Sequence, residues 1–496
     1  MAHRTIRHGL RLVILIASIL ACMFIFAAAA IQFGIHTLNQ WQTYSTIHGM
    51  QPPVASDSVV VFAPHSDDET LGCGGILSLA KSNKAKIKIV LLTNGDGFRF
   101  AAARTYKTVR VTHQRMIDLA YRRQGETLYA LQQFDLARSD VEFLGYPDRG
   151  LAKMWEVNWS PEQPYTSKAT GWNYVGYDNA PSRYAPYCGE SLLEDIEKQL
   201  ISSKPTIVFI PHPLDNHSDH YGTYCFVTSA LEQLASEGHV FAKNVKLYTY
   251  LVHRGDWPTP NKGIDSSMLM PPHSLVQGDT SWISLALPDD VIRAKRKAIM
   301  CYKTQTNLEK TFLLGFARPN ELFGIVQSGI AANVPQGYMS PKIDLLKWRG
   351  IVPVATDPVG DYVMAEMSRG GDVRSIYACT DGRLLFLRTD FAGKLSKRVT
   401  YSIVVKNPDA PKNTKPYEIR INKLSLSNPD GLMWFYKGNS LQVTIPLSRL
   451  GAGDHLYVQV TTKLSRITVD NTGWRTMQLL PTVAKHETIK KSGSKL

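Results

Sequence analysis

The chain has 496 residues, of which 44% are hydrophobic and 20% are charged. This composition excludes an intrinsically disordered protein, and the length predicts two domains rather than one. The net charge is +14, but the Lys and Arg residues are scattered and no RNA-binding motif accompanies them, which argues against nucleic acid as a partner.

The first 35 residues are predicted to form a transmembrane signal anchor. Three arginines precede an apolar run from Leu12 to about Ile35, which is long enough for one helix to cross a bilayer. The positive flank is expected to stay in the cytoplasm, so the rest of the chain is expected to lie outside it, held at the membrane. Cleavage near Ala27–Ala30 is the alternative and would give a secreted protein. Residues 36–56 are predicted to be a linker.

A polar cluster follows the first predicted strand of the main domain. The β-branched run that starts at Ser58 is typical of a buried strand, and His65-Ser66-Asp67-Asp68-Glu69 comes directly after it. A turn and a helix over Ile76–Lys81 are expected next. A histidine and a carboxylate three positions apart at the carboxyl end of a strand can bind one small cation. A helix N-cap alone would explain one of the two aspartates, but not both beside a histidine.

Strand and helix patterns alternate after this cluster. Strands are predicted over Lys86–Thr93, Val141–Leu144 and Thr206–Ile210, and helices over Gln114–Gln132 and Leu192–Ile201. This order predicts an α/β fold with a Rossmann-like, mostly parallel sheet and helices on both faces. Residues 150–190 interrupt the alternation and are rich in Trp and Tyr, so they are expected either to stack on sugar rings or to cover the core.

A second polar cluster follows the strand at 206–210. Its sequence is Pro211-His212-Pro213-Leu214-Asp215-Asn216-His217-Ser218-Asp219-His220. His65, Asp68 and one histidine of this segment would supply two nitrogens and one carboxylate, which is the ligand type of a catalytic zinc that keeps one position open for water. Two such clusters, each after a buried strand, predict a metal site.

The pattern changes in the last third of the chain. From Asp372 onward, short strands are separated by turns rich in Asn and Gly, and helix patterns are absent. This predicts an all-β, antiparallel sandwich over residues 371–482, joined by a linker at 336–370 and followed by a disordered tail at 483–496. An accessory or binding role is expected for the sandwich, because its sequence contains no cluster of His and carboxylate residues.

The two polar clusters resemble those of the PIG-L / LmbE-like family of metal-dependent N-deacetylases. That family carries His-Pro-Asp-Asp-Glu after its first strand and His-Pro-Asp-His later, and here Ser66 and Ser218 replace the two prolines. Further similar segments are Thr93-Asn94-Gly95-Asp96, Phe143-Leu144-Gly145-Tyr146-Pro147-Asp148 and Tyr302-Lys303-Thr304-Gln305. The resemblance implies a deacetylase domain over residues 57–335.

The resemblance also implies a role for individual residues. One zinc ion per chain, or another divalent ion in its place, would be bound by His65, Asp68 and His220. The catalytic residues would be Asp67, as general base, and His217, which would stabilise the oxyanion and protonate the amine, or would alternatively be a fourth ligand. Supporting positions would be held by Asp219, which orients a histidine, and by Asp96, Arg123 and Asp148.

The implied function is removal of the N-acetyl group from an N-acetylglucosamine-type sugar, on a glycolipid, glycoside or polysaccharide, by metal-activated water. The alternative is a catalytically silent, membrane-anchored carbohydrate-binding protein, in which the sandwich would bind the sugar. The presence of both Asp67 and His217 argues against that alternative. Another zinc-dependent hydrolysis, such as phosphoester cleavage, would be favoured by a second metal ion, for which the clusters contain too few carboxylates.

Overall fold

The computed structural model describes residues 47–480, except 256, 259–265, 277, 363, 366–367, 411–415, 423, 425–432 and 452. The anchor predicted over residues 1–35 and the tail predicted over 483–496 therefore lie outside the described residues. Across the part of the chain that is described, we find no helix whose length and apolar character would let it span a membrane.

Residues 58–326 form a mixed α/β domain around one sheet. The strand order is β7-β8-β6-β5-β2-β3-β4, with parallel pairing from β6 through β4, whereas β8 is antiparallel to both β6 and β7. The strands, preceded by the two-residue β1 (His48–Gly49), are β2 (Ser58–Ala63), β3 (Lys86–Thr93), β4 (Val141–Tyr146), β5 (Ile207–Pro211), β6 (Lys246–Tyr250), β7 (Thr280–Ala286) and β8 (Asn320–Val326).

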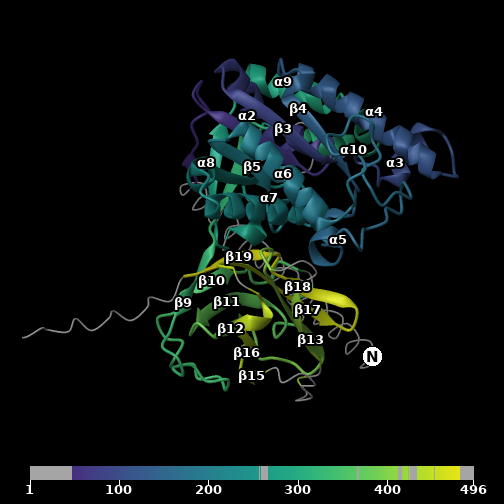
Figure 1. Ribbon diagram of the computed structural model, residues 1–496. Helices are drawn as coiled ribbons and strands as arrows, with labels where there is room; N and C mark the ends of the chain where they lie inside the picture. Colours follow the sequence, from purple (N-terminus) through teal and green to yellow (C-terminus); the bar gives the residue numbers. More distant parts are fainter. Residues whose placement is uncertain are drawn as a thin grey trace, which may run out of the picture. The chain divides into compact units, whose positions relative to one another are not determined.

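Helices cover both faces of this sheet (Figure 1). Helix α9 packs against α2 and α4, while α7 packs against α5 and α6, and both α2 and α7 contact strand β2. Because both faces are covered, Val59 to Phe62 of β2 are fully buried. The helices are α2 (Asp68–Ser82), α3 (Arg99–Thr105), α4 (His113–Gln132), α5 (Leu151–Glu156), α6 (Gly189–Ser203), α7 (Ser218–Ser236), α8 (Val240–Asn244), α9 (Asp289–Ile299) and α10 (Lys303–Leu314), with 3₁₀ turns η1 (Arg138–Asp140) and η2 (His273–Leu275). A third 3₁₀ turn, η3 (Leu447–Arg449), belongs to the C-terminal domain.

Helix α2 begins earlier than the sequence predicted. It starts at Asp68 rather than at Ile76, so the segment expected to be a turn is its first two turns. The glycines in this segment serve close packing: a Cβ atom on Gly75 would lie 2.6 Å from Leu287 Cδ2 and 2.9 Å from Glu321 Cδ. The early start places both Asp67 and Asp68 at the helix N-terminus, beside its unpaired N–H groups.

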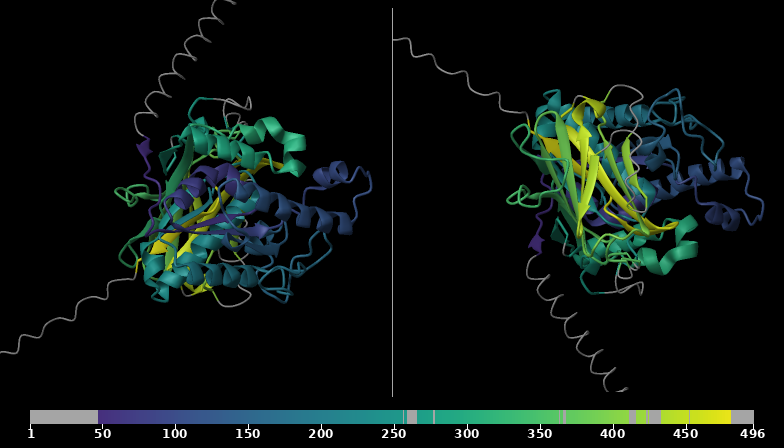
Figure 2. Two further views of the ribbon diagram at one scale, coloured as in Figure 1. Left: turned by 90° about the horizontal axis from the view of Figure 1, so that it is seen from above. Right: turned by 90° about the horizontal axis from the view of Figure 1, so that it is seen from below.

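A C-terminal β-sheet domain follows. Its strand order is β14-β13-β17-β19-β9-β11-β12-β16-β15, with β10 added to β11 and β18 added to β17, and its strands appear in green and yellow in the right-hand view of Figure 2. Side chains from both halves of the sheet, such as Leu387, Ile403 and Val458, bury into one core. The strands are β9 (Gly329–Asn333), β10 (Pro353–Thr356), β11 (Val373–Thr380), β12 (Leu384–Phe391), β13 (Val399–Lys406), β14 (Tyr417–Ile421), β15 (Met433–Lys437), β16 (Ser440–Pro446), β17 (His455–Leu464), β18 (Ile467–Asn471) and β19 (Arg475–Leu479).

Strand β9 departs from the sequence prediction. It lies within the range assigned to the deacetylase domain, 57–335, yet it pairs in parallel with β11 and β19, so this sheet is not antiparallel throughout. Strand β10 likewise lies within the predicted linker, 336–370, and pairs with β11. The segment Gly-Ile-Ala-Ala-Asn of β9 has no polar–apolar alternation, which is why the sequence pattern did not indicate a strand.

Aromatic side chains from the α/β domain and the β-sheet domain form one buried cluster. Trp155 of α5 lies with its ring 4.9 Å from that of Tyr457 and 6.2 Å from that of Trp474, measured between centroids. Trp155 therefore covers the core, which is one of the two roles expected for the aromatic residues of 150–190. Tyr174 and Tyr184 of the same loop are 37% and 63% exposed, so they remain accessible to a ligand.

We expect Gly473→Ala to destabilise the protein more than Gly438→Ala does. Both glycines have positive φ, 61° and 64°, so each substitution should cost about 1 kcal/mol from backbone strain. A Cβ atom at Gly473 would also lie 2.5 Å from the carbonyl oxygen of Pro213, whereas nothing lies within 4 Å of one at Gly438. Relieving that overlap should cost a further ~1–3 kcal/mol in the free energy of unfolding, measured by chemical denaturation. Equal losses for the two variants would contradict the contact with Pro213.

Candidate active site

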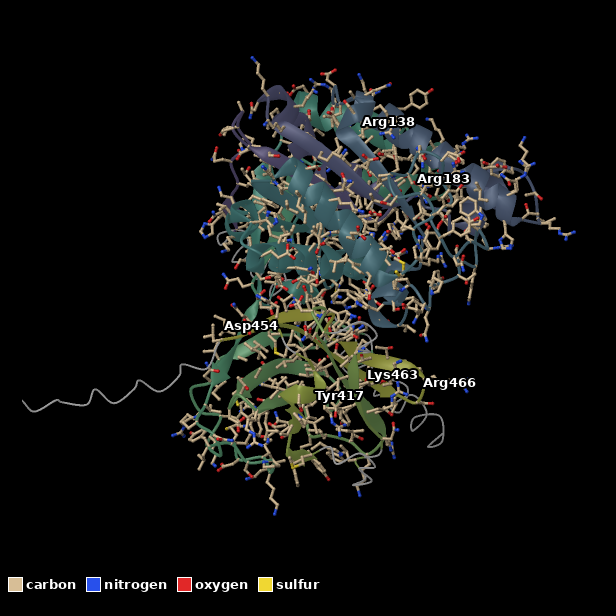
Figure 3. The ribbon with its side chains drawn as sticks, in the orientation of Figure 1. Arg138, Arg183, Tyr417, Asp454, Lys463 and Arg466 are labelled. Atoms are coloured by element: carbon tan, nitrogen blue, oxygen red, sulfur yellow. The ribbon has the colours of Figure 1, made fainter. Side chains whose placement is uncertain are left out.

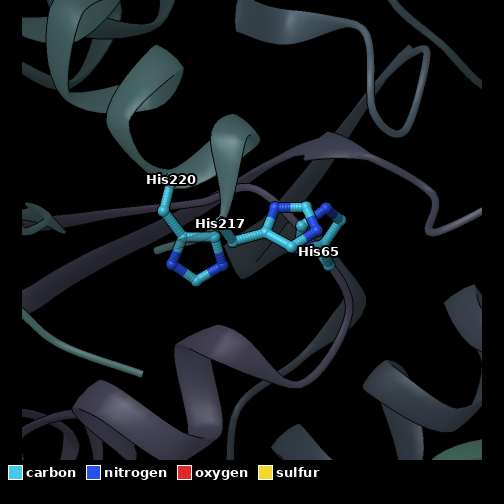
Figure 4. Close-up of side chains that lie close together, drawn as sticks. All are labelled: His65, His217 and His220. Atoms are coloured by element: carbon cyan, nitrogen blue, oxygen red, sulfur yellow. The ribbon is translucent and has the colours of Figure 1, made fainter. Parts of the chain in front are cut away.

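The two polar clusters lie at one edge of the α/β sheet. Strands β2 and β5 are parallel neighbours, and each delivers its cluster from its carboxyl end, directly before α2 and α7 respectively. The rings of His65, His217 and His220 group together there (Figure 4), with centroids 4.6 Å apart for His65 and His217 and 5.4 Å apart for His217 and His220. This edge of a parallel sheet is where ligands bind in α/β folds.

Asp68 lies between the two predicted histidine ligands. Its Oδ2 atom is 3.1 Å from Nδ1 of His65 and 3.2 Å from Nε2 of His220, and all three side chains are buried. Ligands of a tetrahedral zinc ion, with bonds of about 2.0–2.2 Å, are separated by ~3.3 Å. Within the described residues, Asp68 Oδ1 and His220 Nε2 have no hydrogen-bond partner. The candidate ligand atoms that all lie within 4.8 Å of one another form two overlapping groups here, His65 with His217 and His220, and Asp68 with His220 and His253. Because His220 belongs to both groups, the side chains gathered at this edge could hold a small divalent ion.

The same three residues attract one another strongly. Burial alone would lower the pKa of His220, but the carboxylates of Asp215 and Asp68 raise it to about 10. Conversely, burial alone would raise the pKa of Asp68, but His220 and His65 hold it well below its usual value. Without a metal ion, Asp68 is thus ionised and His220 is protonated, so an ion bound by both would take the place of the imidazole proton.

Asp67 has a different neighbour from Asp68. It is the N-cap residue of α2, with φ 116° and ψ −31°, a conformation rare outside glycine that a non-glycine residue holds only when its surroundings enforce it. Its Oδ1 atom lies 3.9 Å from Nη2 of Arg123, which donates hydrogen bonds to the carbonyl oxygens of Ser66 and Gly95 at 2.8 and 3.0 Å. Burial, together with the Asp68 charge, raises the pKa of Asp67 well above its usual value. Adjacent aspartates therefore face different partners.

His217 presents a defined hydrogen-bond donor. It caps the N-terminus of α7, where its Nδ1 atom accepts from the backbone N–H of Asp219 at 3.2 Å. Because a neutral imidazole that accepts at Nδ1 carries its proton on Nε2, the Nε2–H is available to a ligand. Burial and the neighbouring His65 lower the pKa of His217 to about 4, which keeps the ring neutral at physiological pH.

Two of the predicted supporting residues, Asp219 and Asp148, lie beside His65. Its Nε2 atom lies 3.1 Å from Asp219 Oδ2 and 3.5 Å from Asp148 Oδ1. Asp219 also accepts the backbone N–H groups of Arg149 and Leu151 at 2.5 and 3.1 Å. Asp96 accepts from the Tyr177 hydroxyl at 2.6 Å and from the backbone N–H of Asp148 at 3.1 Å, and burial raises the pKa of Asp96 to about 7. Asp96 therefore holds the loop after β4 in place rather than contacting the histidines.

Comparison with protein families identifies part of the chain. Residues 60–231 match the family described as "PIG-L: GlcNAc-PI de-N-acetylase", a range that contains both polar clusters and the strands that carry them. Residues 60–231 are a PIG-L domain. No curated protein matches the chain.

The structure that contains the PIG-L domain is similar to several solved structures. A conserved protein from Thermus thermophilus is 19% identical, with 55% of this chain and 94% of that chain covered and a TM-score of 0.32. The N,N'-diacetylchitobiose deacetylase from Pyrococcus horikoshii is 17% identical (54% and 84% covered, TM-score 0.34). The zinc inhibited form of teicoplanin deacetylase is 15% identical (54% and 96% covered, TM-score 0.34). Because these TM-scores are low, the function of this protein is inferred from the PIG-L domain and the site described above, not from these structures.

Two residues of the site were not assigned from the sequence. Asp215 Oδ2 lies 3.1 Å from Nδ1 of His220 and accepts the backbone N–H groups of Val252 and His253 at 3.0 and 2.9 Å. His253 follows β6, and its ring lies 4.9 Å from that of His220. Asp215 belongs to the second polar cluster, so the sequence could have indicated it as a site residue. His253 follows a strand that the sequence pattern did not indicate.

Asp215→Asn is expected to weaken metal binding by the PIG-L domain. The carboxylate faces the ring nitrogen of His220 that points away from Asp68, and loss of such an outer partner typically costs 10–100-fold in metal affinity. Zinc affinity, measured by competition with a chromogenic chelator, should fall by about this factor. Asp178→Asn, at an exposed aspartate of the same domain, should leave affinity unchanged. Equal affinity for the wild type and Asp215→Asn would contradict an orienting role.

Proposed function

We propose that this protein is a metal-dependent amide hydrolase that removes the acetyl group from an N-acetylglucosamine-type sugar. The observation that carries the proposal is the convergence of His65 and His220 on one oxygen of Asp68, with Asp67 and His217 beside them but turned to other partners. The PIG-L domain supports the substrate class and the deacetylase chemistry. Zinc is the ion that suits two imidazoles and one carboxylate.

His65, Asp68 and His220 would hold the ion, and Asp219 and Asp215 would keep the two rings oriented. A divalent ion in this place polarises an amide carbonyl and lowers the pKa of a water molecule. Asp67 would take the proton of the attacking water at a carboxylate oxygen, because its side chain is not engaged by the histidines. Arg123 keeps Asp67 in position by fixing the backbone of Ser66 and Gly95.

His217 would donate a hydrogen bond from Nε2 to the amide oxygen as negative charge develops there. A neutral histidine that gave up this proton would become an imidazolate, so His217 is a poor source of the proton that the leaving amine needs. The proton taken up by Asp67 can instead pass to the amine nitrogen when the C–N bond breaks. The products are acetate and a free amino sugar, and the protonation states of both residues are restored.

The direct test is the release of acetate from N-acetylglucosamine-containing substrates by the purified protein. We expect acetate and new amine in equal amounts. Substrates that differ only in what the sugar is attached to, a lipid, a small aglycone or a glycan chain, would identify the substrate class. If none of them yields acetate when zinc is supplied, and the protein still binds the sugar, the carbohydrate-binding alternative would replace the proposal.

A further inference from the structure

Three buried aspartates outside the active site offer a second place for a cation. Asp357 follows β10, Asp361 lies four residues later, and Asp470 lies on β18. One carboxylate oxygen from each lies within 4.8 Å of the other two. The side chains of Asp357 and Asp361 are 2% and 0% exposed, and Asp470 is 0% exposed.

Three of the six carboxylate oxygens of this aspartate cluster lack donors among the described residues. Within the described residues, neither oxygen of Asp357 and not Oδ1 of Asp361 has a hydrogen-bond partner. Asp470 accepts one backbone N–H at each oxygen, from Val373 and Asn471, both at 2.6 Å. Buried carboxylates without donors are costly, so a positive partner is expected where the free oxygens meet.

The neighbouring arginines do not balance the charge. Arg254 Nη2 lies 2.6 Å from Asp361 Oδ2, and Arg475 lies 3.6 Å from Asp357 Oδ1 and 3.2 Å from Asp279 Oδ1. Two guanidinium groups thus contact three carboxylates, and Asp470 adds a fourth carboxylate that contacts neither arginine. This leaves two negative charges uncompensated among the residues that the structure describes. Burial and the charge of Asp361 accordingly raise the pKa of Asp357 well above its usual value.

We propose that Asp357, Asp361 and Asp470 bind one calcium ion. Carboxylate oxygens are the ligands that calcium prefers, and calcium tolerates irregular geometry completed by water. Two Ca–O bonds of about 2.3–2.6 Å can span up to about 5 Å, which accommodates oxygens within 4.8 Å of one another. A divalent ion also matches the two uncompensated charges. Zinc is less suitable because no histidine or cysteine belongs to the cluster.

The aspartate cluster lies where the β-sheet domain meets the loop that carries the second polar cluster of the active site. All three aspartates follow β10 in the chain, whereas Arg254 directly follows His253. Besides Asp361, Arg254 binds the carbonyl oxygen of Leu214 through Nη1 at 3.0 Å, one residue before Asp215. Calcium bound here would therefore stabilise the junction between the two domains as a structural ion.

The test is calcium titration of the purified full-length protein at constant buffered zinc. We expect one calcium ion per chain by equilibrium dialysis and a rise in Tm of roughly 3 °C at a hundredfold excess over Kd. Asp357→Asn and Asp470→Asn should each lose both responses. Asp454→Asn, which changes an exposed aspartate of the same domain (Figure 3), should keep both.

Several outcomes would overturn the calcium site. One is a wild-type protein that neither binds calcium nor gains stability from it. This result would be decisive even if the variants failed to fold, because it needs no variant. Another is a response to Mg²⁺ but not to Ca²⁺. A third is stabilisation by acid and not by calcium, which would mean that the carboxylates share a proton. His220→Ala should keep its calcium, so loss of the zinc site and of the calcium site are distinguishable.

Discussion

Asp67→Asn should lower the deacetylation rate by about a hundred- to ten-thousand-fold, the usual effect of losing a positioned general base. Asparagine keeps the size of the side chain but cannot take the proton of the attacking water. The zinc content per chain should not change, because Asp67 faces Arg123 rather than the histidines. The two quantities to measure are kcat and metal content on the same preparation.

The matched control for this prediction is the neighbouring residue. Asp67 and Asp68 are adjacent residues at the N-terminus of α2, and they differ in their contacts. If Asp67→Asn lost its metal while Asp68→Asn retained it, the two roles would be exchanged. If Asp67→Asn kept both its metal and its full rate, the proposed mechanism would be wrong.

Asp68→Asn and His220→Ala are expected to lose metal. The oxygen Asp68 Oδ2 is the shared neighbour of both histidine nitrogens, so removing its charge removes the centre of the ligand set. The fall in metal affinity should exceed the 10–100-fold loss that is typical for an outer partner such as Asp215. Activity should be lost without added metal and should return in part for Asp68→Asn when zinc is in excess.

His212→Ala serves as the control for His220→Ala. His212 belongs to the same histidine-rich segment, but its ring bonds to Thr280 and to the backbone N–H of Leu214, so it should alter stability without removing metal. Loss of metal in His212→Ala with retention in His220→Ala would contradict the ligand assignment. Metal content is measured by elemental analysis after dialysis.

The residues brought together at the site could be predicted because each group lies in one short segment after a strand. His65 and Asp68 are three residues apart behind a β-branched run, and His217, Asp219 and His220 open a helix behind another. Adjacent parallel strands end at the same edge, so the two segments had to meet once both strands were in one sheet. Their proposed roles remain predictions until variants are measured.

Contacts between segments far apart in the chain could not be predicted. The cluster of Asp357, Asp361 and Asp470 joins a loop to a strand more than a hundred residues later, and no local spacing indicates it. The position of Asp215 behind His220 depends on how α7 begins. The glycines of α2 look like turn residues in sequence, and only the packing against Leu287 and Glu321 shows that they belong to a helix.

The most direct test of the central claim combines acetate release with metal content for the wild type and Asp67→Asn. The wild-type protein, containing one zinc ion per chain, should release acetate from an N-acetylglucosamine-containing substrate, and removal of the metal should abolish that release. Asp67→Asn should carry the same zinc and release acetate at least about a hundredfold more slowly. Acetate release that persists in wild-type protein stripped of metal, or that is equal in wild type and Asp67→Asn, would contradict the account.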